Sequence, residues 1–256
     1  MAGRGVDQGW TTGAKAVHCW LLVARTGCFR FYSGVQPIFF ITGTDTGAGK
    51  TVLTSLLAQH LRERGVRVAA FKPVCSGGRE DARALHAALA GTLTLAEINP
   101  WHFRAAIAPM LAARREKKQV SARAICDHIR TAQKGFAITL VEGAGGLLSP
   151  MGEKFDSRDL MVALRARPII VAPDKLGVVN QLLLTLEALP ARSRAQARIV
   201  LMTPAKPDAA TASNAGLLGE FFPARNIFKL PWFGKHFATA QALKNPAVRR
   251  TLAALI

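Results

Sequence analysis

Long hydrophobic runs are missing from this chain of 256 residues. Its longest uninterrupted apolar stretches are as short as Trp20–Ala24 and Ile169–Pro173, whereas a membrane-spanning helix needs about 20 apolar residues. Hydrophobic residues still make up 50% of the chain, and a chain of this length buries enough surface to fold without a disulfide or metal staple. We therefore expect a soluble protein with no membrane partner.

Cysteine is scarce as well. The four cysteines are Cys19, Cys28, Cys75 and Cys126; no two form a CxxC pair, and no histidine stands at the spacing of zinc ligands. This pattern is typical of reduced thiols rather than of a disulfide framework. It predicts a cytoplasmic protein.

Acidic side chains are few, 16 against 34 Lys and Arg, which leaves a net charge of +18. Such an excess attracts phosphates, carboxylates or nucleic acid through long-range fields. The basic residues are spread along the chain with one concentration, at Arg104, Arg114, Arg115, Lys117, Lys118 and Arg123. No aromatic residue interleaves with that run, so it offers no platform for stacking bases. We interpret it as a solvated helical face and predict no specific nucleic-acid partner.

Residues 1–36 differ from the rest of the chain. They contain a single acidic residue, Asp7, and show no sustained hydrophobic period. We predict an extension that is disordered or outside the fold, and an organelle transit peptide stays open as an alternative because the segment is Arg-rich and poor in acid. The predicted domain covers residues 37–256.

From Pro37 onward, short apolar runs alternate with helical patterns. Nearly continuous hydrophobicity is typical of strands covered on both faces, and the runs are Ile38–Thr42, Val66–Val74, Ala137–Val141, Ile169–Pro173, Arg198–Met202 and Asn226–Trp232. Helices are expected from Lys50 to Gly65, from Ser121 to Lys134, and over Ser157–Arg165, Val178–Leu189, Ala209–Phe222 and His236–Ile256. This order predicts an α/β fold with a mostly parallel sheet and helices on both faces, a three-layer arrangement like that of P-loop NTPases.

The clearest motif is GTDTGAGKT over Gly43–Thr51, which follows the first predicted strand and opens the first helix. Its glycines let backbone N–H groups approach an anion at the helix N-terminus. Lys50 would reach the β- and γ-phosphates of a nucleotide, and Thr51 would offer its hydroxyl to Mg²⁺. The loop is one residue longer than the strict GxxxxGK pattern. Asp45 stands where partitioning and cell-division-site ATPases carry a second lysine, which disfavours that class.

Two later strand ends carry charged residues toward the same place. Lys72 follows the second strand in FKPVCSGG, and Glu142 follows a later strand in VEGAGG. Because ligands bind at the carboxyl ends of the strands in such sheets, we expect the Lys72 ammonium in the ligand crevice. The Glu142 carboxylate can hold Mg²⁺ opposite Thr51, and the glycines after it leave room for phosphate or substrate.

Taken together, these motifs resemble the dethiobiotin synthetase family. The matching stretches are GTDTGAGKT, FKPVCSGG, NPWHF, VEGAGGLLSP, DKLGVVNQLLLT and LPW, in the family's order between Ile38 and Trp232. The resemblance implies an ATP-dependent ligase of biotin biosynthesis. Such an enzyme joins CO₂ to 7,8-diaminononanoate and closes the cyclic urea of dethiobiotin, through a carbamate and a carbamic-phosphoric anhydride. It also implies ATP as co-substrate, Mg²⁺ as cofactor and a homodimer.

The resemblance implies roles for particular residues. Lys72 looks like the catalytic lysine that bridges carbamate and γ-phosphate, and the Mg²⁺ ligands would be Thr51, Asp81 and Glu142. Substrate contacts would come from Ser76 and from a clamp for the tail carboxylate, supplied by a second subunit through Gly177, Val178, Val179 and Asn180. The ATP-binding set would be Thr46, Gly47, Ala48, Gly49, Lys50, Thr51, Val52, Asp81, Glu142, Gly143, Ala144, Gly145, Thr203, Pro204, Pro231, Trp232 and Phe233.

The chain departs from the family in three places. The loop between Ser76 and Asp81 is short, so Glu80 stays open as an alternative to Asp81. His102 lies where the family has an NPxxF segment, and we interpret it as a packed or surface residue. The dipeptide Thr203-Pro204 stands where family members have Asn-Asp, whose amide pairs with adenine. A site without that amide lacks the paired donor and acceptor that read a base edge, so we expect weak discrimination between ATP, GTP and CTP.

Two other functions stay open at this point. The first is a related P-loop ligase, or the ATPase half of an amidotransferase, acting on another small amine or acid. The second is a partitioning-type ATPase, which the high positive charge favours and which Asp45 and Lys72 disfavour. ATP turnover with the diamine and bicarbonate, compared with turnover stimulated by DNA, distinguishes these possibilities.

Overall fold

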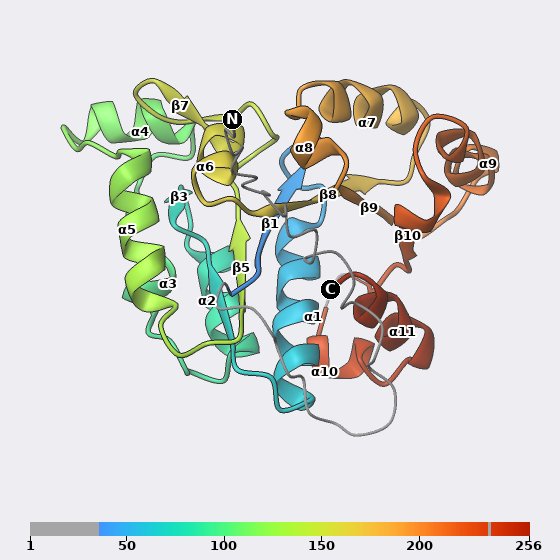
Figure 1. Ribbon diagram of the computed structural model, residues 1–256, viewed down its shortest axis with the longest axis horizontal. Helices are drawn as coiled ribbons and strands as arrows, with labels where there is room; N and C mark the ends of the chain where they lie inside the picture. Colours follow the sequence, from blue (N-terminus) through green and yellow to red (C-terminus); the bar gives the residue numbers. More distant parts are fainter. Residues whose placement is uncertain (1–35, 235–236) are drawn as a thin grey trace, which may run out of the picture. The chain divides into compact units, whose positions relative to one another are not determined.

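A six-stranded sheet forms the core of the computed structural model, which describes residues 36–234 and 237–256, all within one compact unit (Figure 1). The strand order is β10–β9–β8–β1–β5–β2, and every neighbouring pair is parallel. The strands are β1 (Ile38–Gly43), β2 (Val68–Phe71), β5 (Ile138–Glu142), β8 (Arg167–Pro173), β9 (Arg198–Met202) and β10 (Ile227–Leu230). The chain therefore begins in the middle of the sheet, builds one edge, and then builds the other.

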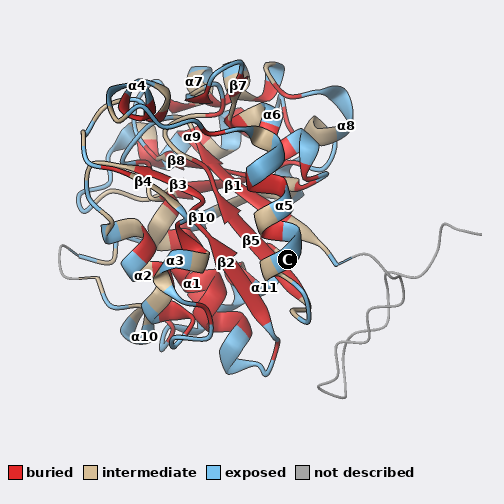
Figure 2. Ribbon diagram, turned by 90° about the vertical axis from the view of Figure 1, so that its left-hand side faces the viewer, coloured by how far each residue is buried: buried red, intermediate tan, exposed pale blue. Residues whose placement is uncertain are grey.

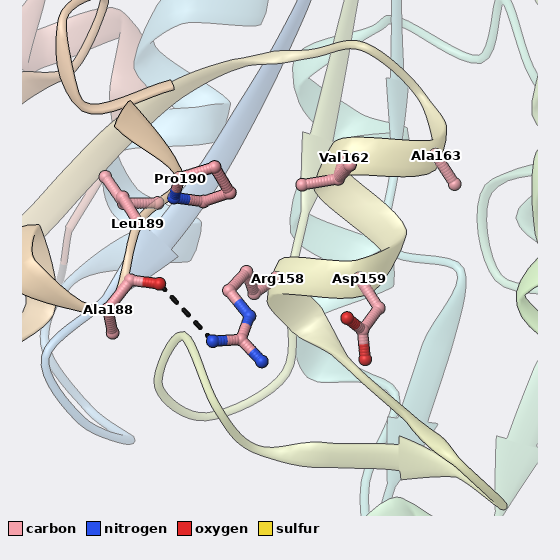
Figure 3. Close-up of a pocket in the computed structure, with 7 residues that line it drawn as sticks. All are labelled: Arg158, Asp159, Val162, Ala163, Ala188, Leu189 and Pro190. Atoms are coloured by element: carbon pink, nitrogen blue, oxygen red, sulfur yellow. Dashed lines mark hydrogen bonds between the residues drawn. The ribbon is translucent and has the colours of Figure 1, made fainter. Parts of the chain in front are cut away.

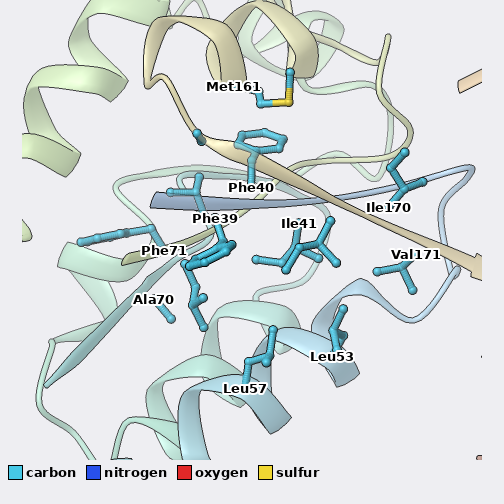
Figure 4. Packing of buried hydrophobic residues seen from close by; sticks show 14 of the residues in the cluster. Phe39, Phe40, Ile41, Leu53, Leu57, Ala70, Phe71, Met161, Ile170 and Val171 are labelled. Carbon is cyan, nitrogen blue, oxygen red and sulfur yellow. The ribbon is translucent and has the colours of Figure 1, made fainter. Parts of the chain in front are cut away.

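Helices cover both faces of the sheet. They are α1 (Lys50–Glu63), α2 (Glu80–Ala88), α3 (Leu95–Ile98), α4 (Pro109–Arg115), α5 (Ala122–Ala132), α6 (Ser157–Ala163), α7 (Val178–Glu187), α8 (Ala191–Arg194), α9 (Ala209–Gly219), the 3₁₀ turn η1 (Ala224–Asn226), α10 (Thr239–Ala242) and α11 (Pro246–Ala254). On one face α1 packs against β1, β2 and β5, and α2, α10 and α11 pack against α1. As Figure 4 shows, α6 lies on the opposite face from α1; α5 packs against α6, and α7 packs against β8 and α9.

The core explains why the strand sequences are almost continuously apolar. Figure 4 shows Phe40 of β1 pointing toward Met161 of α6, while Ile41 points to the other side of the strand, toward Leu53 and Leu57 of α1. All five side chains are fully buried. Successive residues of β1 thus pack alternately against the helices on the two faces of the sheet. Both faces of the strand are buried, so both are apolar. Figure 2 shows the same division, with buried strands between helices whose outer surfaces are exposed.

The parallel arrangement brings the carboxyl ends of the strands to one edge of the sheet. The phosphate loop follows β1 there, Glu142 is the last residue of β5, and Lys72 comes directly after β2. The loop before α7 follows β8 at the same edge, and Thr203 follows β9. The predicted α/β fold, with a parallel sheet between helices, is confirmed.

Two short sheets lie outside the main one. β3 (Val74–Ser76) pairs in parallel with β4 (Trp101–Phe103), and β6 (Pro150–Gly152) pairs in antiparallel fashion with β7 (Phe155–Asp156). The strand predicted over Val66–Val74 is therefore two strands in two different sheets. It divides at Lys72-Pro73, because proline has no N–H to donate to a sheet ladder.

The predicted helix over His236–Ile256 is also wrong as a single element. Residues 235–236 lie outside the described residues, and the remainder forms α10 and α11. Asn245 has extended backbone angles and caps α11, its side chain accepting a hydrogen bond from the Ala247 N–H at 2.9 Å. A residue before proline is pushed out of the helical region, so Pro246 ends one helix and begins the next.

Some predictions concern parts of the chain beyond these elements. The predicted extension over residues 1–36 lies outside the described residues except for Gln36, so it stays a prediction. Cys75 and Cys126 are buried and free of disulfides. In the described ranges, 36–234 and 237–256, no helix combines the length and apolar character needed to cross a membrane.

Candidate active site

The phosphate loop has the backbone conformation that an anion cradle requires. Gly49 is the N-cap of α1 with φ 99°, and Gly47 has φ 74°, both in the left-handed region that favours glycine. A Cβ atom on Gly49 would stand 3.0 Å from the Cγ of Met202, a tighter contact than most real side chains make. The loop therefore ends directly on the N-terminus of α1, where free N–H groups and the helix dipole favour a negative charge.

Lys50 is buried at the start of α1, and its Nζ donates a hydrogen bond to the backbone carbonyl of Asp45 at 2.8 Å. Burial, followed by repulsion from Lys72, lowers the pKa of the Lys50 ammonium to about 8. Two cations in one buried region destabilise each other unless anions join them. This part of the site is prepared for a polyanion.

Lys72 forms the centre of a buried charged cluster. Its Nζ lies 2.7 Å from Oε1 of Glu142 and 3.0 Å from Oδ2 of Asp81, and it donates to the backbone carbonyl of Gly143 at 3.1 Å. Thr51 joins the cluster, because its hydroxyl donates to the same Oε1 of Glu142 at 2.8 Å. Lys72 is 4% exposed and Glu142 is fully buried. Two strand ends, those of β2 and β5, and the first turns of α1 and α2 thus bring their polar side chains to one point.

The charges in this cluster fix one another's protonation. Burial works to lower the pKa of the Lys72 ammonium, but the carboxylates of Glu142 and Asp81 outweigh it and hold that pKa above its ordinary value. Burial works to raise the pKa of Asp81, but the Lys72 ammonium outweighs it and leaves that pKa below its ordinary value. The cluster therefore keeps Lys72 protonated at neutral pH.

The oxygen atoms of the cluster fit a magnesium ion held together with a nucleotide. Oε2 of Glu142 is buried and has no hydrogen-bond partner, which is costly unless a ligand supplies one. Among the described residues, no group of three or more His, Cys, Asp or Glu side chains is placed to hold a metal. Magnesium commonly takes one or two carboxylates and completes its shell with water and substrate phosphates. The hydroxyl of Thr51 and the carboxylates of Asp81 and Glu142 match that kind of site.

The glycine-rich turn after β5 lies against the phosphate loop. A Cβ atom on Gly146 would come within 3.3 Å of the carbonyl oxygen of Thr44, and one on Gly145 would come within 3.8 Å of the Thr46 hydroxyl. The hydroxyl of Ser149 accepts a hydrogen bond from the Gly146 N–H at 2.8 Å and holds the turn. Of the predicted residues, Gly145 and Thr46 are therefore brought close together. Gly143 and Ala144 belong to the same turn, while Gly47, Ala48 and Val52 belong to the phosphate loop and the first turn of α1.

The segment around Ser76 lies beside this region. Ser76 ends β3 and is paired with Phe103 of β4. His102, on the same strand β4, has its Nε2 2.7 Å from the carbonyl oxygen of Gly77. The ring is therefore engaged with backbone, which agrees with the interpretation of His102 as a packed residue. The short loop that follows leads directly to α2 and Asp81.

The remaining predicted residues do not touch the charged cluster. Gly177 is the N-cap of α7 with φ 87°, followed by Val178, Val179 and Asn180 in the first turn of that helix. The residues predicted to surround the nucleobase follow β9 and β10, and the Thr203 N–H donates to the Leu230 carbonyl at 2.9 Å. They are Thr203, Pro204, Pro231, Trp232 and Phe233, with Trp232 exposed.

A cavity of ≈ 530 Å³ is found elsewhere, between α6 and the connection from α7 to α8. Figure 3 shows Arg158 reaching across it toward Ala188, whose carbonyl accepts a hydrogen bond from the guanidinium at 3.4 Å. None of its lining residues belongs to the charged cluster. We therefore place the candidate site at the phosphate loop, where the chemistry-bearing groups meet, and not at this cavity.

Comparisons with known proteins place these features in a family. A family profile described as an AAA domain matches residues 38–236. The ATP-dependent dethiobiotin synthetase BioD of Anaeromyxobacter sp. (strain Fw109-5) is 45% identical over 166 residues, which cover 63% of this chain and 74% of that protein. The protein of the same name from Akkermansia muciniphila is 36% identical over 187 residues, covering 73% of this chain and 88% of the relative.

Solved structures share the fold at low sequence identity. The structure of pNOB8 ParA bound to nonspecific DNA has a TM-score of 0.52 at 10% identity, covering 86% of this chain and 97% of that chain. The cell division protein MinD of Aquifex aeolicus has a TM-score of 0.52 at 12% identity, covering 86% of this chain and 95% of its own. At such identities the likeness describes the fold alone.

Proposed function

The chain belongs to the family of ATP-dependent dethiobiotin synthetases, and we propose that it catalyses that family's ligase reaction in biotin biosynthesis. The substrate would be 7,8-diaminononanoate, with CO₂ and ATP as co-substrates and dethiobiotin as product. The observation that carries the proposal is the Lys72 ammonium held between Glu142 and Asp81 beside the phosphate loop. No feature of the described residues favours another small acid or amine, or a partitioning function.

The proposed chemistry needs an activated oxygen. One amine of the substrate adds to CO₂ and loses a proton, which gives a carbamate. A carbamate oxygen then attacks the γ-phosphorus of ATP and ADP leaves, because an unmodified carbamate oxygen is a poor leaving group. Finally the second amine attacks the carbonyl carbon, and phosphate departs with the electrons of the C–O bond. Each of these steps crowds negative charge into one place, where fixed cations stabilise it best.

The residues of the cluster have complementary roles in this proposal. Lys50 and the N–H groups of the phosphate loop would hold the triphosphate, and Lys72 would neutralise the charge shared by carbamate and γ-phosphate as the phosphoryl group moves. Ser76 would contact the substrate. Magnesium, bound by Thr51, Asp81 and Glu142 with the nucleotide, would supply charge neutralisation at the phosphates.

We also propose a homodimer in which the N-terminus of α7 serves the partner's substrate. The loop and first turns of α7 display large apolar side chains to solvent, with Leu176 84% exposed and Leu184 64% exposed. Apolar residues so exposed near a proposed clamp are suited to a protein interface. A cytoplasmic location is likewise a proposal, which the free thiols of Cys75 and Cys126 support.

The direct test is chemical. Purified protein is incubated with 7,8-diaminononanoate, ATP, Mg²⁺ and ¹³C-bicarbonate, and the product is identified by mass spectrometry. The proposal expects dethiobiotin carrying one ¹³C atom in its urea carbon, and one ADP for each product. ATP hydrolysis that DNA stimulates, with no labelled product from the diamine, would contradict it.

The domain prediction has its own test. We propose that residues 37–256 carry the whole activity, because β1 begins at Ile38 and the phosphate loop follows it. A protein lacking residues 1–36 is then expected to keep the turnover and ATP affinity of the full chain. Loss of folded, active protein on this deletion would show that the segment contributes to the domain.

A further inference from the structure

Two residues without an assigned role, Arg79 and Asn99, join the segment before α2 to the segment after α3; Asn99 opens the stretch NPWHF, and Arg79 lies outside the matched stretches. Nε of Arg79 donates to Oδ1 of Asn99 at 3.0 Å. Nη2 of Arg79 donates to the backbone carbonyl of Asn99 at 2.9 Å and to that of Leu95 at 3.3 Å. The guanidinium therefore donates to both the side chain and the backbone of Asn99. This forked geometry is one that a lysine ammonium cannot reproduce.

Asn99 in turn holds the backbone of Lys72. Its side chain Nδ2 donates to the Lys72 carbonyl at 2.8 Å, and the neighbouring Ile98 carbonyl accepts from the Lys72 N–H at 3.0 Å. Asn99 is 1% exposed. Both peptide groups of Lys72 are thus fixed by two consecutive residues at the end of α3.

These two hydrogen bonds to the Lys72 backbone matter because Lys72 is the first residue after β2, where the chain leaves the main sheet. β2 ends at Phe71, and Pro73 carries no N–H, so the ladder that fixes the other strand residues stops at Lys72. A buried carbonyl needs a donor, and the Asn99 amide supplies it. Without the amide, the backbone that carries the Lys72 side chain loses a defined position.

Arg79, the second residue of this pair, is connected to Asp81. Arg79 is the N-cap residue of α2, and its carbonyl accepts the first helical hydrogen bond, from the Arg83 N–H at 2.9 Å. Asp81 lies in the first turn of that helix, with Oδ2 3.0 Å from Nζ of Lys72. Arg79 and Asn99 therefore connect the backbones of the two residues whose side chains form the ion pair.

We propose that Arg79 and Asn99 are positioning residues for the synthetase reaction, which set the place of Lys72 and Asp81 at the phosphate loop without touching the substrate. The inference rests on the proposed function. The phosphate loop itself belongs to other elements, β1 and α1. Of the proposed nucleotide-binding residues this pair positions Asp81 alone, so its main effect is on the chemical step.

Two variants test separately the hydrogen bond from Asn99 to the Lys72 backbone and the hydrogen bonds donated by Arg79. Asn99→Asp keeps the volume and the acceptor for Arg79 but removes the donor to the Lys72 carbonyl. Arg79→Met keeps most of the apolar stem and removes all three donated hydrogen bonds. Arg83→Ala is the matched control, because Arg83 lies on the same helix and makes only an exposed ion pair with Glu80.

The readout is turnover per ATP-binding site, with the number of sites taken from the calorimetric stoichiometry of ATP binding. A displacement of order 1 Å at a reacting group can cost about 100-fold in rate. We expect losses of turnover of about 10- to 100-fold for Asn99→Asp and Arg79→Met, with unchanged stoichiometry, with ATP affinity reduced far less than turnover, and with Arg83→Ala equal to the wild type. The double variant should lose no more than the worse single variant, since the two residues act as one unit.

A second readout needs no turnover. Lys72 is buried and ion-paired, so an amine-reactive reagent should modify it slowly relative to the exposed Lys134 in wild-type protein. In Asn99→Asp and Arg79→Met this ratio should rise several-fold.

Variants with fewer binding sites but wild-type turnover per site would overturn the inference, because they would indicate a purely structural role. Unchanged turnover per site, or an unchanged labelling ratio, would also overturn it. If the wild type makes no dethiobiotin and the labelling ratio still rises in the variants, the proposed function fails while the positioning of Lys72 stands.

Discussion

Buried ionisable side chains near the two ends of helix α1 lie in opposite electrostatic environments. At its N-terminus, Lys50 and Thr51 adjoin Lys72, whose ammonium lies within hydrogen-bond distance of two carboxylates. Ten residues later, about 15 Å along the helix axis, His60 is 2% exposed and neither of its ring nitrogens has a partner. Burial, then the positive charges of Arg64 and Arg249, lower the pKa of His60, while Glu63 raises it.

The difference shows how the same helix can hold a charged site and a neutral core position. At the N-terminus, opposite charges compensate one another, so the ions survive burial and are available to a reaction. Around His60, burial and the positive charges of Arg64 and Arg249 outweigh the single opposing charge of Glu63, so the ring stays neutral at neutral pH and behaves as part of the packing around α1. Burial of an ionisable group is therefore evidence for a site only where its partners also converge.

Among substitutions that keep Lys72, we expect the largest loss of turnover from a change of Asp81, which belongs to the charged cluster at the N-terminus of α1. Its carboxylate reaches Lys72, whereas the adjacent Glu80 points outward, with a side chain 77% exposed and paired to Arg83. We expect Asp81→Asn to lower turnover at saturating ATP by about 10- to 100-fold, and the matched change Glu80→Gln to leave it unchanged. Steady-state assays at several Mg²⁺ concentrations check this, and the reverse ranking would assign the role to Glu80.

A smaller effect, on stability alone, is expected at His60. A histidine whose folded pKa lies below its unfolded value of 6.5 contributes stability that is fully present above 6.5 and is lost as the pH falls from 6.5 toward the folded pKa. Denaturant unfolding at about pH 7.5 and about pH 5.5 measures this window.

His60→Leu should remove that part of the pH dependence and keep wild-type turnover, because His60 touches no site residue. An unchanged pH dependence in His60→Leu would mean that protonation of His60 is accommodated in the folded protein.

The smallest difference is expected between nucleotides. The proposed base-binding residues follow β9 and β10, where Pro204 has no N–H and the Thr203 N–H is already donated to Leu230. Little remains there to read a base edge, so we expect kcat/KM for ATP, GTP and CTP to lie within about 100-fold of one another. A larger preference for ATP would reveal base contacts from other residues.

Much of the fold was predictable from the sequence because its signals are local. Continuous apolar runs indicated buried strands, and the glycines and Lys50 of the phosphate loop indicated an anion cradle. The placement of Lys72 and Glu142 at strand ends followed from the parallel order of the sheet. The break at Pro246 was also present in the sequence as a local signal, and the prediction of one C-terminal helix overlooked it.

What could not be predicted depends on distant contacts. Nothing near Asn99 in the sequence indicates that its amide reaches the Lys72 carbonyl, because the two residues meet only after α3 folds against the end of β2. The lowered pKa of His60 likewise depends in part on Arg249 of α11, which comes nearly two hundred residues later in the chain. Asn99 opens the stretch NPWHF, but that stretch does not reveal which backbone group the amide contacts, and the contact becomes visible only through geometry.

The most direct test of the account compares two buried ionisable side chains, Lys72 beside the N-terminal end of α1 and His60 near the C-terminal end of that helix. Lys72→Met and His60→Leu both replace a buried ionisable group with an apolar one, and turnover to dethiobiotin is measured per ATP-binding site. We predict a loss of about 100-fold or more for Lys72→Met with ATP affinity retained, and no change for His60→Leu. Near-normal turnover by Lys72→Met with weakened ATP affinity would contradict the account, because Lys72 would then be a binding residue only.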